Sequence, residues 1–249
     1  MWELWQDLTD LGFEQGEADP CVWTLHDDDG KYDGAMALDV DDIFIAANQR
    51  MFDIILGDLG EKYLVGEIEC DSLTHCAIEW DQSKNGDVSA KQNEYTSQMS
   101  ETPIPIDSNT GLEVTNKMIR LDEHSKKTHH SLVMQLRWVT ANTRPDYDAD
   151  VDSLQSTMHV ATVNNLLQAN KILRALRETP HMYMRHSAKR FSKPVPFCVF
   201  DAAYQNRHDG CSTGGMMVGI RETDRSKDCN RCDLLHWNAK KIGRGLYPP

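Results

Sequence analysis

The sequence predicts an α+β protein, in which both helices and antiparallel strands build the core. Apolar residues recur at helical spacing in several segments, and short apolar runs bounded by turn residues stand between them. Asn85–Gly86, which separates two such runs, is typical of a β-hairpin. The 249 residues are 40% hydrophobic and 26% charged, which suits one large or two modest globular domains with a sizeable core.

The first hundred residues mix the two patterns. Leucines recur at helical spacing in LWQDLTDLGF (residues 4–13), where Gly12 can end the helix, and the spacing returns in MFDIILGDLGEKY (51–63). The expected strands are CVWTL (21–25), the two halves of AMALDVDDIFIAA (35–47, joined at 40–42), THCAIEWD (74–81) and GDVSAKQ (86–92). Residues 1–101 therefore form the first predicted domain.

Helices dominate after a Pro-, Ser-, Asn- and Gly-rich linker at residues 102–111. The expected helices are HSLVMQLRWVTAN (130–142), RPDYDADVDSLQSTM (144–158) and TVNNLLQANKILRALRET (162–179). The expected later strands are VPFCVFDAAY (195–204), STGGMMVGI (212–220) and LLHWNAKK (234–241). The pattern change sets two further domain boundaries, giving 102–190 and 191–249.

Charge is distributed unevenly along the chain. The net charge is −13, but residues 1–100 balance at −18 and residues 101–249 at +5. An acidic protein is a poor stand-alone nucleic-acid binder, because phosphate contacts supply most of that affinity. The split suggests two functional regions, with any basic partner-binding surface in the second.

Compartment and membrane association follow from composition. No run of about 18 apolar residues is present, and the acidic N-terminal segment lacks the order of a signal peptide. Seven cysteines, an odd and scattered set, suit a reducing environment. We expect an intracellular protein, cytoplasmic or nuclear, that is not secreted and has no membrane partner.

LDVDD (residues 38–42) places three carboxylates between two apolar strands. An EF-hand is excluded, because the sixth and twelfth positions counted from Asp39 are Phe44 and Arg50. Two readings stay open. One is a solvated acidic turn, and the other is a hairpin that fixes carboxylates for magnesium-dependent phosphoryl transfer.

The segment LDVDDIFIAA resembles the Tyr-Val-Asp-Asp hairpin of reverse transcriptases in copia-type retrotransposon Pol polyproteins. The resemblance extends along the chain. LWQDLTDLGFEQGEADPCVWTL is similar to the family's segment before this hairpin, and Thr143-Arg144-Pro145-Asp146 is similar to its most specific later motif. VFDAAYQNRHDGCSTGGMMVGI and LLHWNAKK resemble the opening of the family's ribonuclease H domain.

The resemblance implies a fold and a function. The fold would be a partial reverse-transcriptase palm (1–101), a helical thumb- or connection-like region (102–190) and the truncated start of a ribonuclease H-like sheet (191–249). The function would be RNA-directed DNA polymerase with ribonuclease H activity, that is, nucleotidyl transfer and hydrolysis through two Mg²⁺ ions. The partners would be an RNA or DNA template–primer and the remainder of the polyprotein.

The resemblance also implies site residues. Asp41 and Asp42 match the polymerase acids, with Asp41 favoured as the direct magnesium ligand, and Asp201 matches the first ribonuclease H carboxylate. All three are expected to be both catalytic and metal-binding. The basic face of residues 162–179 is a candidate nucleic-acid surface, through Lys171, Arg174 and Arg177. A solvated face around an apolar stripe is the favoured alternative there.

Several departures from the family limit the expected activity. The family's third polymerase acid lies upstream of the position of Trp5, and its next ribonuclease H glutamate is not found after Lys241. Asp39 replaces the family's aromatic residue and adds a like charge on the strand face of Asp41. Whether the chain is an enzyme is therefore left open, and we expect no activity from it alone.

Three hypotheses remain at this stage. The chain is a fragment of a reverse transcriptase that works only within a longer polyprotein. Alternatively, it is a degenerate or co-opted remnant without enzymatic activity, at most a weak nucleic-acid-binding module. The third reading, an unrelated acidic binding module, would require the ordered motif matches to be coincidental.

Other conspicuous side chains have structural interpretations. His129 and His130 precede a helical pattern without a ligand partner at i+4, so both are expected at the surface. Cysteines in apolar runs (Cys21, Cys76, Cys198) and tryptophans in apolar contexts (Trp80, Trp138, Trp237) are expected in the core.

Overall fold

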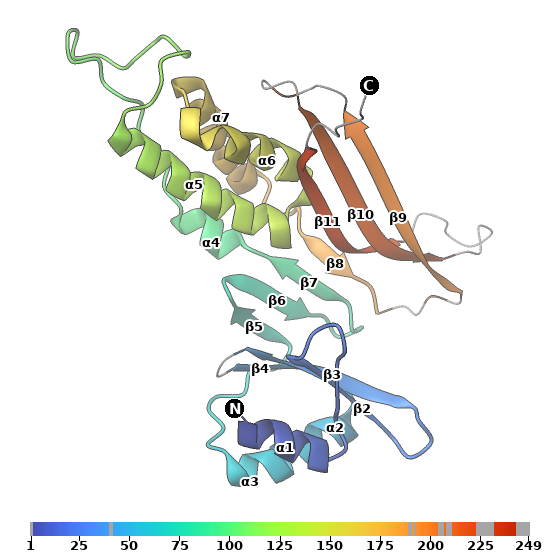
Figure 1. The fold of residues 1–249 in the computed structure, drawn as a ribbon. Coiled ribbons are helices and arrows are strands. Elements are labelled where there is room, and N and C mark those ends of the chain that lie inside the picture. The colour runs from blue at the N-terminus through green and yellow to red at the C-terminus, as the bar shows by residue number, and fades with distance from the viewer. Residues whose placement is uncertain are drawn as a thin grey trace. The chain divides into compact units, whose positions relative to one another are not determined.

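The computed structural model describes residues 2–39, 42–188, 191, 193–203, 207, 211–222 and 232–242. The fold is α+β, as the sequence predicted, and its sheets are antiparallel (Figure 1). The chain divides into two compact units, residues 1–68 and 69–249. The predicted boundary between residues 101 and 102 lies inside the second unit.

The first unit is a four-stranded sheet with helices against one face (Figure 1). The sheet has the order β1-β2-β3-β4, and each strand is antiparallel to its neighbour. The strands are β1 (Glu14–Gln15), β2 (Val22–His26), β3 (Tyr32–Asp39) and β4 (Asp42–Ala47). The helices are α1 (Trp2–Asp10), α2 (Gln49–Ile54), the π-helical turn η1 (Ile55–Leu59) and α3 (Gly60–Lys62).

One apolar cluster holds this unit together. Strand residues two apart share a face, so alternate residues of β2 and β3 point toward the helices. The buried cluster contains Leu8, Phe13, Trp23, Leu25, Met36, Met51, Ile55 and Leu59. The leucine pattern in residues 4–13 thus found a real core helix. Each large apolar side chain buried there contributes about 1.5–3 kcal/mol.

A polar contact ties the two ends of the helical layer together. Asp7 on α1 accepts hydrogen bonds from Lys62 Nζ at 2.6 Å and from the Tyr63 hydroxyl at 2.7 Å. The hydrogen bond to Asp7 is the main cause that raises the pKa of Tyr63 to about 12. This contact fixes α3 against α1 within the first unit.

The second unit begins with a four-stranded antiparallel sheet of order β5-β6-β7-β8. Its strands are β5 (Ser72–His75), β6 (Ile78–Gln82), β7 (Val88–Lys91) and β8 (Met184–His186). β8 follows the helices in sequence and pairs with β7, so it closes the sheet over a long sequence separation. At that junction Asp87 accepts hydrogen bonds from Arg185 and from the Ala188 N–H at 2.8 Å, and these lower the pKa of Asp87 to about 2.

Helices form the largest core of the second unit. They are α4 (Asn93–Gln98), α5 (Glu123–Asn142), the 3-10 turn η2 (Pro145–Tyr147), α6 (Asp148–Thr157), the 3-10 turn η3 (Met158–Val160) and α7 (Val163–Glu178). Asp122 caps α5 by accepting the Ser125 N–H at 2.7 Å, and Thr162 and Asn165 form a capping box on α7. Leu132, Leu136, Leu166 and Leu173 are fully or almost fully buried in this unit.

The first residue of the predicted linker, Thr102, is docked onto this helical core. Thr102 is buried, and its backbone N–H and C=O bond to the side chain of Asn170 on α7 at 2.9 and 2.8 Å. Asn170 is itself buried, so both polar groups are satisfied without water. Residue 102 is therefore part of the second unit and does not behave as a free connection.

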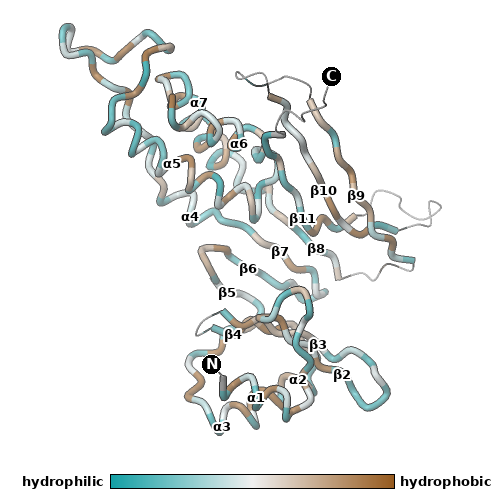
Figure 2. The backbone as a smooth tube through the Cα atoms, in the orientation of Figure 1, coloured by the Kyte–Doolittle hydropathy of each residue, from teal (hydrophilic) through white to brown (hydrophobic). Residues whose placement is uncertain are grey.

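A third antiparallel sheet completes the second unit, with order β11-β10-β9. Its strands are β9 (Pro194–Ala203), β10 (Ser212–Glu222) and β11 (Cys232–Ile242). Figure 2 shows apolar residues along β9 and β10. Many of them are exposed, including Phe200 at 81% and Val199 at 57%. In the described part of the chain, much of this sheet's apolar surface is thus open to solvent.

The interpretation of His129 as a surface residue was wrong. Its side chain is 0% exposed, whereas His130 is exposed as predicted. The signal was present in the sequence, because His129, Leu132, Val133 and Leu136 follow helical spacing on one face of α5. Burial lowers the pKa of His129 to about 4.

The core assignments of the small and aromatic residues were also wrong. The cysteines expected inside are exposed: Cys21, Cys76 and Cys198. Trp138 is 41% exposed, and Trp80 and Trp237 are only partly buried. The predicted strand at 74–81 is interrupted at Cys76–Ala77, which places Cys76 in a turn.

Candidate functional site

The acidic hairpin consists of β3, β4 and the residues that join them. The two strands pair in register from Gly34↔Ala47 to Leu38↔Ile43, and the last described pair is Asp39↔Asp42. Val40 and Asp41, including the acid favoured as the direct magnesium ligand, lie outside the described residues. The strand register therefore shows that the two predicted strands pair as far as Asp39 and Asp42.

The base of the hairpin is held by a buried acid. Asp33 on β3 is 6% exposed. It accepts a hydrogen bond from Asn48 Nδ2 at 2.6 Å and forms an ion pair with Arg50. Burial acts to raise the pKa of Asp33, but the hydrogen bonds from Asn48 and Arg50 outweigh it and lower the pKa. Asn48 also caps α2 by accepting the Met51 N–H at 3.0 Å. The hairpin is thus anchored to the helix that follows it.

The donor chemistry at the tip fits a hard cation in part. Asp39 and Asp42 are both exposed, and they face each other across the hairpin. Magnesium takes oxygen ligands, usually one or two carboxylates with water and substrate phosphates. Asp42 supplies such a ligand, and Asp41 adds a second by sequence. Like charges directly opposite one another are destabilising unless a cation lies between them.

Asp201, the third predicted acid, belongs to the second unit. It lies on β9 opposite Gly215 of β10, and its side chain is exposed. Its Oδ1 accepts the Ala202 N–H at 2.8 Å. Asp201 therefore lies in the antiparallel three-stranded sheet of the second unit, whereas the hairpin acids belong to the first unit.

Two of the three basic residues predicted on α7 make contacts within the chain. Arg174 forms a bidentate pair with Glu101, at 2.8 and 2.6 Å. Arg177 donates to the carbonyls of Thr96 at 3.0 Å, Ser97 at 3.2 Å and Met99, at the end of α4. These carbonyls have no partner within their own helix end, so Arg177 acts as a cap. Lys171 is exposed on the same helix.

The Thr143-Arg144-Pro145-Asp146 motif has a structural role that the sequence did not reveal. Arg144 is 6% exposed and pairs with both oxygens of Asp146, at 2.9 and 2.7 Å. It also donates to Thr179 Oγ1 at 3.0 Å, just beyond the end of α7. The Thr143 hydroxyl donates to Gln92 Oε1 at 2.9 Å. The motif therefore joins α5, α7 and the segment before α4.

Asp148 is a second buried acid that sequence reasoning missed. It is 3% exposed at the start of α6 and is paired with Arg137 of α5. Its Oδ2 accepts the Ala239 N–H of β11 at 2.6 Å, and Trp237 donates to the Thr140 carbonyl at 2.7 Å. These contacts dock the edge of the third sheet onto the helices. Such long-range pairs leave no local signal in the sequence.

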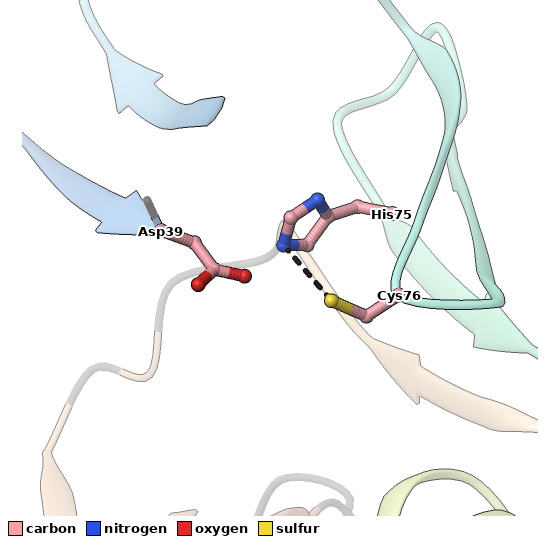
Figure 3. Close-up of side chains that lie close together, drawn as sticks. All are labelled: Asp39, His75 and Cys76. Atoms are coloured by element: carbon pink, nitrogen blue, oxygen red, sulfur yellow. Dashed lines mark hydrogen bonds between the residues drawn. The ribbon is translucent and has the colours of Figure 1, made fainter. Parts of the chain in front are cut away.

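Figure 3 shows Asp39 at the end of β3 and, in the second unit, His75 and Cys76 at the turn between β5 and β6. Cys76 Sγ is 3.4 Å from His75 Nε2. Thiolate and imidazole are donors that suit Zn²⁺ better than Mg²⁺. The pair alone supplies half of a four-ligand zinc site, so its chemistry differs from that expected of the acidic hairpin.

A basic groove was also missed. It lies between α5, α6 and η3, and it is lined by Lys126, Lys127, His130, Gln155, Met158 and His159. The two lysines precede the helix predicted at 130–142, because the observed α5 begins seven residues earlier at Glu123. The groove could not be recognised before the crossing of α5 and α6 was known.

Comparison with known proteins adds no family assignment: no protein-family model, curated protein or solved structure matches the chain. The resemblance to copia-type polyproteins therefore depends on the sequence motifs alone. None of the helices in the described part of the chain combines the length and apolar character needed to cross a bilayer.

Proposed function

We propose that the chain is a fragment of a copia-type reverse transcriptase with the start of its ribonuclease H domain. In the intact parent, the activity would be two-metal phosphoryl transfer on an RNA or DNA template–primer. The supporting observation is the acidic hairpin, whose strand register converges on Asp39 and Asp42 and which is anchored at its base by Asp33. A bound magnesium pair would stabilise the attacking and leaving oxygens of the transfer.

Two features of the second unit agree with this proposal. Asp201 lies on the first strand of an antiparallel three-stranded sheet, which is the element order expected from the resemblance. The helical region of α5, α6 and α7 lies between the palm-like and ribonuclease H-like segments in sequence. The chain's own residues would hold cations at Asp41, Asp42 and Asp201. Asp39, which adds a like charge beside the hairpin acids, is why we expect the chain alone to be inactive.

Metal binding at the acidic hairpin is the first test. Mn²⁺, a paramagnetic substitute for Mg²⁺, is titrated into the wild-type chain, Asp41→Asn/Asp42→Asn and the control Asp28→Asn/Asp29→Asn. The control removes the same charge from another exposed acidic turn of the same unit. We expect electron paramagnetic resonance to detect one strong Mn²⁺ site that only the hairpin variant loses. Equal binding by all three proteins would contradict a hairpin site.

Polymerase activity is the second test. Primer extension is measured with the 249-residue chain, and then with the product of the longest reading frame that its transcript carries. We expect no synthesis by the chain alone, and Mg²⁺-dependent synthesis by the longer product that Asp41→Asn abolishes. A longer product that binds Mn²⁺ at the hairpin but never extends a primer would instead support the remnant hypothesis.

One observation favours that second candidate, a co-opted or degenerate remnant without activity. Asp39 faces Asp42 at the hairpin tip, where the family carries an aromatic residue. Without a metal, the two like charges oppose strand pairing. In a remnant, Asp39→Tyr would stabilise the metal-free chain and leave Mn²⁺ affinity unchanged. In a working site, Asp39→Tyr would change the Mn²⁺ affinity.

A further inference from the structure

The groove between α5, α6 and η3, called here the α5–α6 groove, has a volume of about 530 Å³. This size lies within the usual range of small-ligand sites. Its lining contains two lysines, two histidines and a glutamine, and none of the six lining residues is acidic. Met158 supplies one apolar wall. The groove is therefore open to solvent, donor-rich and locally basic within a protein of net charge −13.

Its positive charge is not cancelled by the acids of the helices that form it. On α6, Asp148 is paired with Arg137, and Asp152 is paired with Arg207. The third acid of α6, Asp150, is exposed but does not line the groove. On α5, Glu123 contacts Lys126 at 2.8 Å, but the Glu123 side chain is 85% exposed. Exposed pairs of this kind contribute little and are screened by salt. Lys126 can therefore exchange Glu123 for a better anion.

The geometry suits phosphate. Lys126 and His130 are four residues apart on α5 and share a face of the helix, and Lys127 is adjacent. His159 faces the same groove from η3, on a separate element. Ammonium groups bind phosphate oxygens as point charges, and imidazole and amide N–H groups add hydrogen bonds. Donors from two sides can thus surround one anion.

The basic face of α7 offers a useful contrast. Arg174 and Arg177 already satisfy Glu101 and the end of α4 within the chain. An incoming phosphate would have to replace these contacts at Arg174 and Arg177. The α5–α6 groove requires the release of two weaker contacts, that of Lys126 with the exposed Glu123 and that of Gln155 Nε2 with Met134 Sδ at 3.6 Å.

We propose that the α5–α6 groove binds a phosphate-bearing anion, with Lys126 and Lys127 as the cationic contacts and His130, His159 and Gln155 as hydrogen-bonding groups. The anion is either a free polyphosphate or the backbone of a nucleic acid, since both present the same oxygens. This binding does not depend on the acidic hairpin. Failure of Mn²⁺ binding would leave it unchanged, and loss of anion binding would leave the hairpin site intact.

The test uses the full chain and two probes. Tripolyphosphate binding is measured by calorimetry, and binding of a short fluorescent single-stranded RNA by anisotropy, both at low salt. The groove variant is Lys126→Gln/Lys127→Gln. The matched control, Lys84→Gln/Lys117→Gln, removes the same charge at exposed positions outside the groove. We expect the groove variant to weaken binding about tenfold or more, and the control to change it little.

Each outcome decides the proposal. Tripolyphosphate binding alone, lost in the groove variant, identifies a small polyphosphate as the ligand. RNA binding that is lost in the groove variant, with or without tripolyphosphate binding, identifies the nucleic-acid backbone. A third variant, Lys171→Gln, tests the basic face of α7. The proposal would be overturned by equal losses in both double variants, by absence of binding by both probes, or by RNA binding that only Lys171→Gln loses. Circular dichroism melts check that the variants fold.

Discussion

Arg144 and Arg174 make the same bidentate contact with a carboxylate but differ in burial. The Arg144 side chain is 7% exposed and that of Arg174 is 56% exposed. Breaking a buried charged pair leaves the remaining partner without a hydrogen-bonding group and out of reach of water. When an exposed pair is broken, water molecules replace the lost contact. We expect Arg144→Gln to lower the free energy of unfolding by about 2–3 kcal/mol. Arg174→Gln should have a much smaller effect. Urea denaturation measures both, and equal losses would contradict this reading of the motif.

His129 makes the stability of the chain depend on pH. Its side chain is fully buried, neither ring nitrogen has a partner among the described residues, and burial lowers its pKa from 6.5 to about 4. The unfolded chain therefore takes up a proton below pH 6.5 that the folded chain refuses until about pH 4. Stability is fully present above pH 6.5 and falls by about 3 kcal/mol as the pH drops through this window.

The variant that isolates this effect is His129→Leu, with His130→Leu as the exposed neighbour control. We expect His129→Leu to flatten the stability curve between pH 6.5 and 4, measured by urea midpoints. His130→Leu should change the slope much less, because burial is the main cause of the lowered His129 pKa and the charge of His130 is only the second. Asp87, with a pKa of about 2, loses its contribution at lower pH and does not obscure the window. An unchanged slope in His129→Leu would show that other groups control the acid response.

At the scale of elements, two hairpin turns in one sheet place different residue types at positions with positive φ: one uses Cys and Ala, and the other uses Gly. The β5–β6 turn has positive φ at both Cys76 (50°) and Ala77 (60°). In two-residue turns of this kind, these positions are normally occupied by Asn and Gly. Trp138 Nε1 holds the Cys76 carbonyl at 3.2 Å. The β6–β7 turn uses Gly86 at φ 84°, and a Cβ there would lie 3.0 Å from Ala188 Cβ.

The two turns give a reciprocal prediction. Ala77→Gly should raise the free energy of unfolding by about 0.5–1 kcal/mol, because it relieves a left-handed backbone. Gly86→Ala should lower it by about 1 kcal/mol or more, since it adds both strain and a close contact. Thermal melts of the two single variants provide the measurement. A loss of stability in both would mean that the backbone is not left-handed at Ala77.

These elements also show what the sequence could predict. Most helices and most strands followed from apolar periodicity, which is a local signal, and so did the position of the acidic hairpin. The short helix α4 was not predicted. The break at Cys76–Ala77 was missed because no glycine or asparagine marks it. The pairing of β8 with β7, the docking of Asp148 on β11 and the α5–α6 groove all depend on contacts between distant residues. No local pattern encodes such contacts.

For the whole molecule, charge separates the two units. Residues 1–68 carry 17 acidic and three basic side chains, whereas residues 69–249 carry 22 acidic and 23 basic ones. A unit with such an excess of acid repels phosphate and attracts cations over several ångströms. Metal binding is therefore favoured in the first unit. Contact with a polyanion is favoured in the second, where the α5–α6 groove lies.

Where the domains divide can also be tested. A recognition site for a sequence-specific protease is inserted between Asn109 and Thr110, at an exposed turn within the predicted linker. After cleavage we expect the two pieces to stay together in native size-exclusion chromatography. The β7–β8 ladder, the Thr102–Asn170 bonds and the Arg177 cap on α4 all cross the cut. They should separate in urea, and the capping variant Arg177→Gln should lower the urea concentration required. Pieces that separate without urea would instead favour a domain boundary within the linker, close to the position between residues 101 and 102 that the sequence pattern predicted.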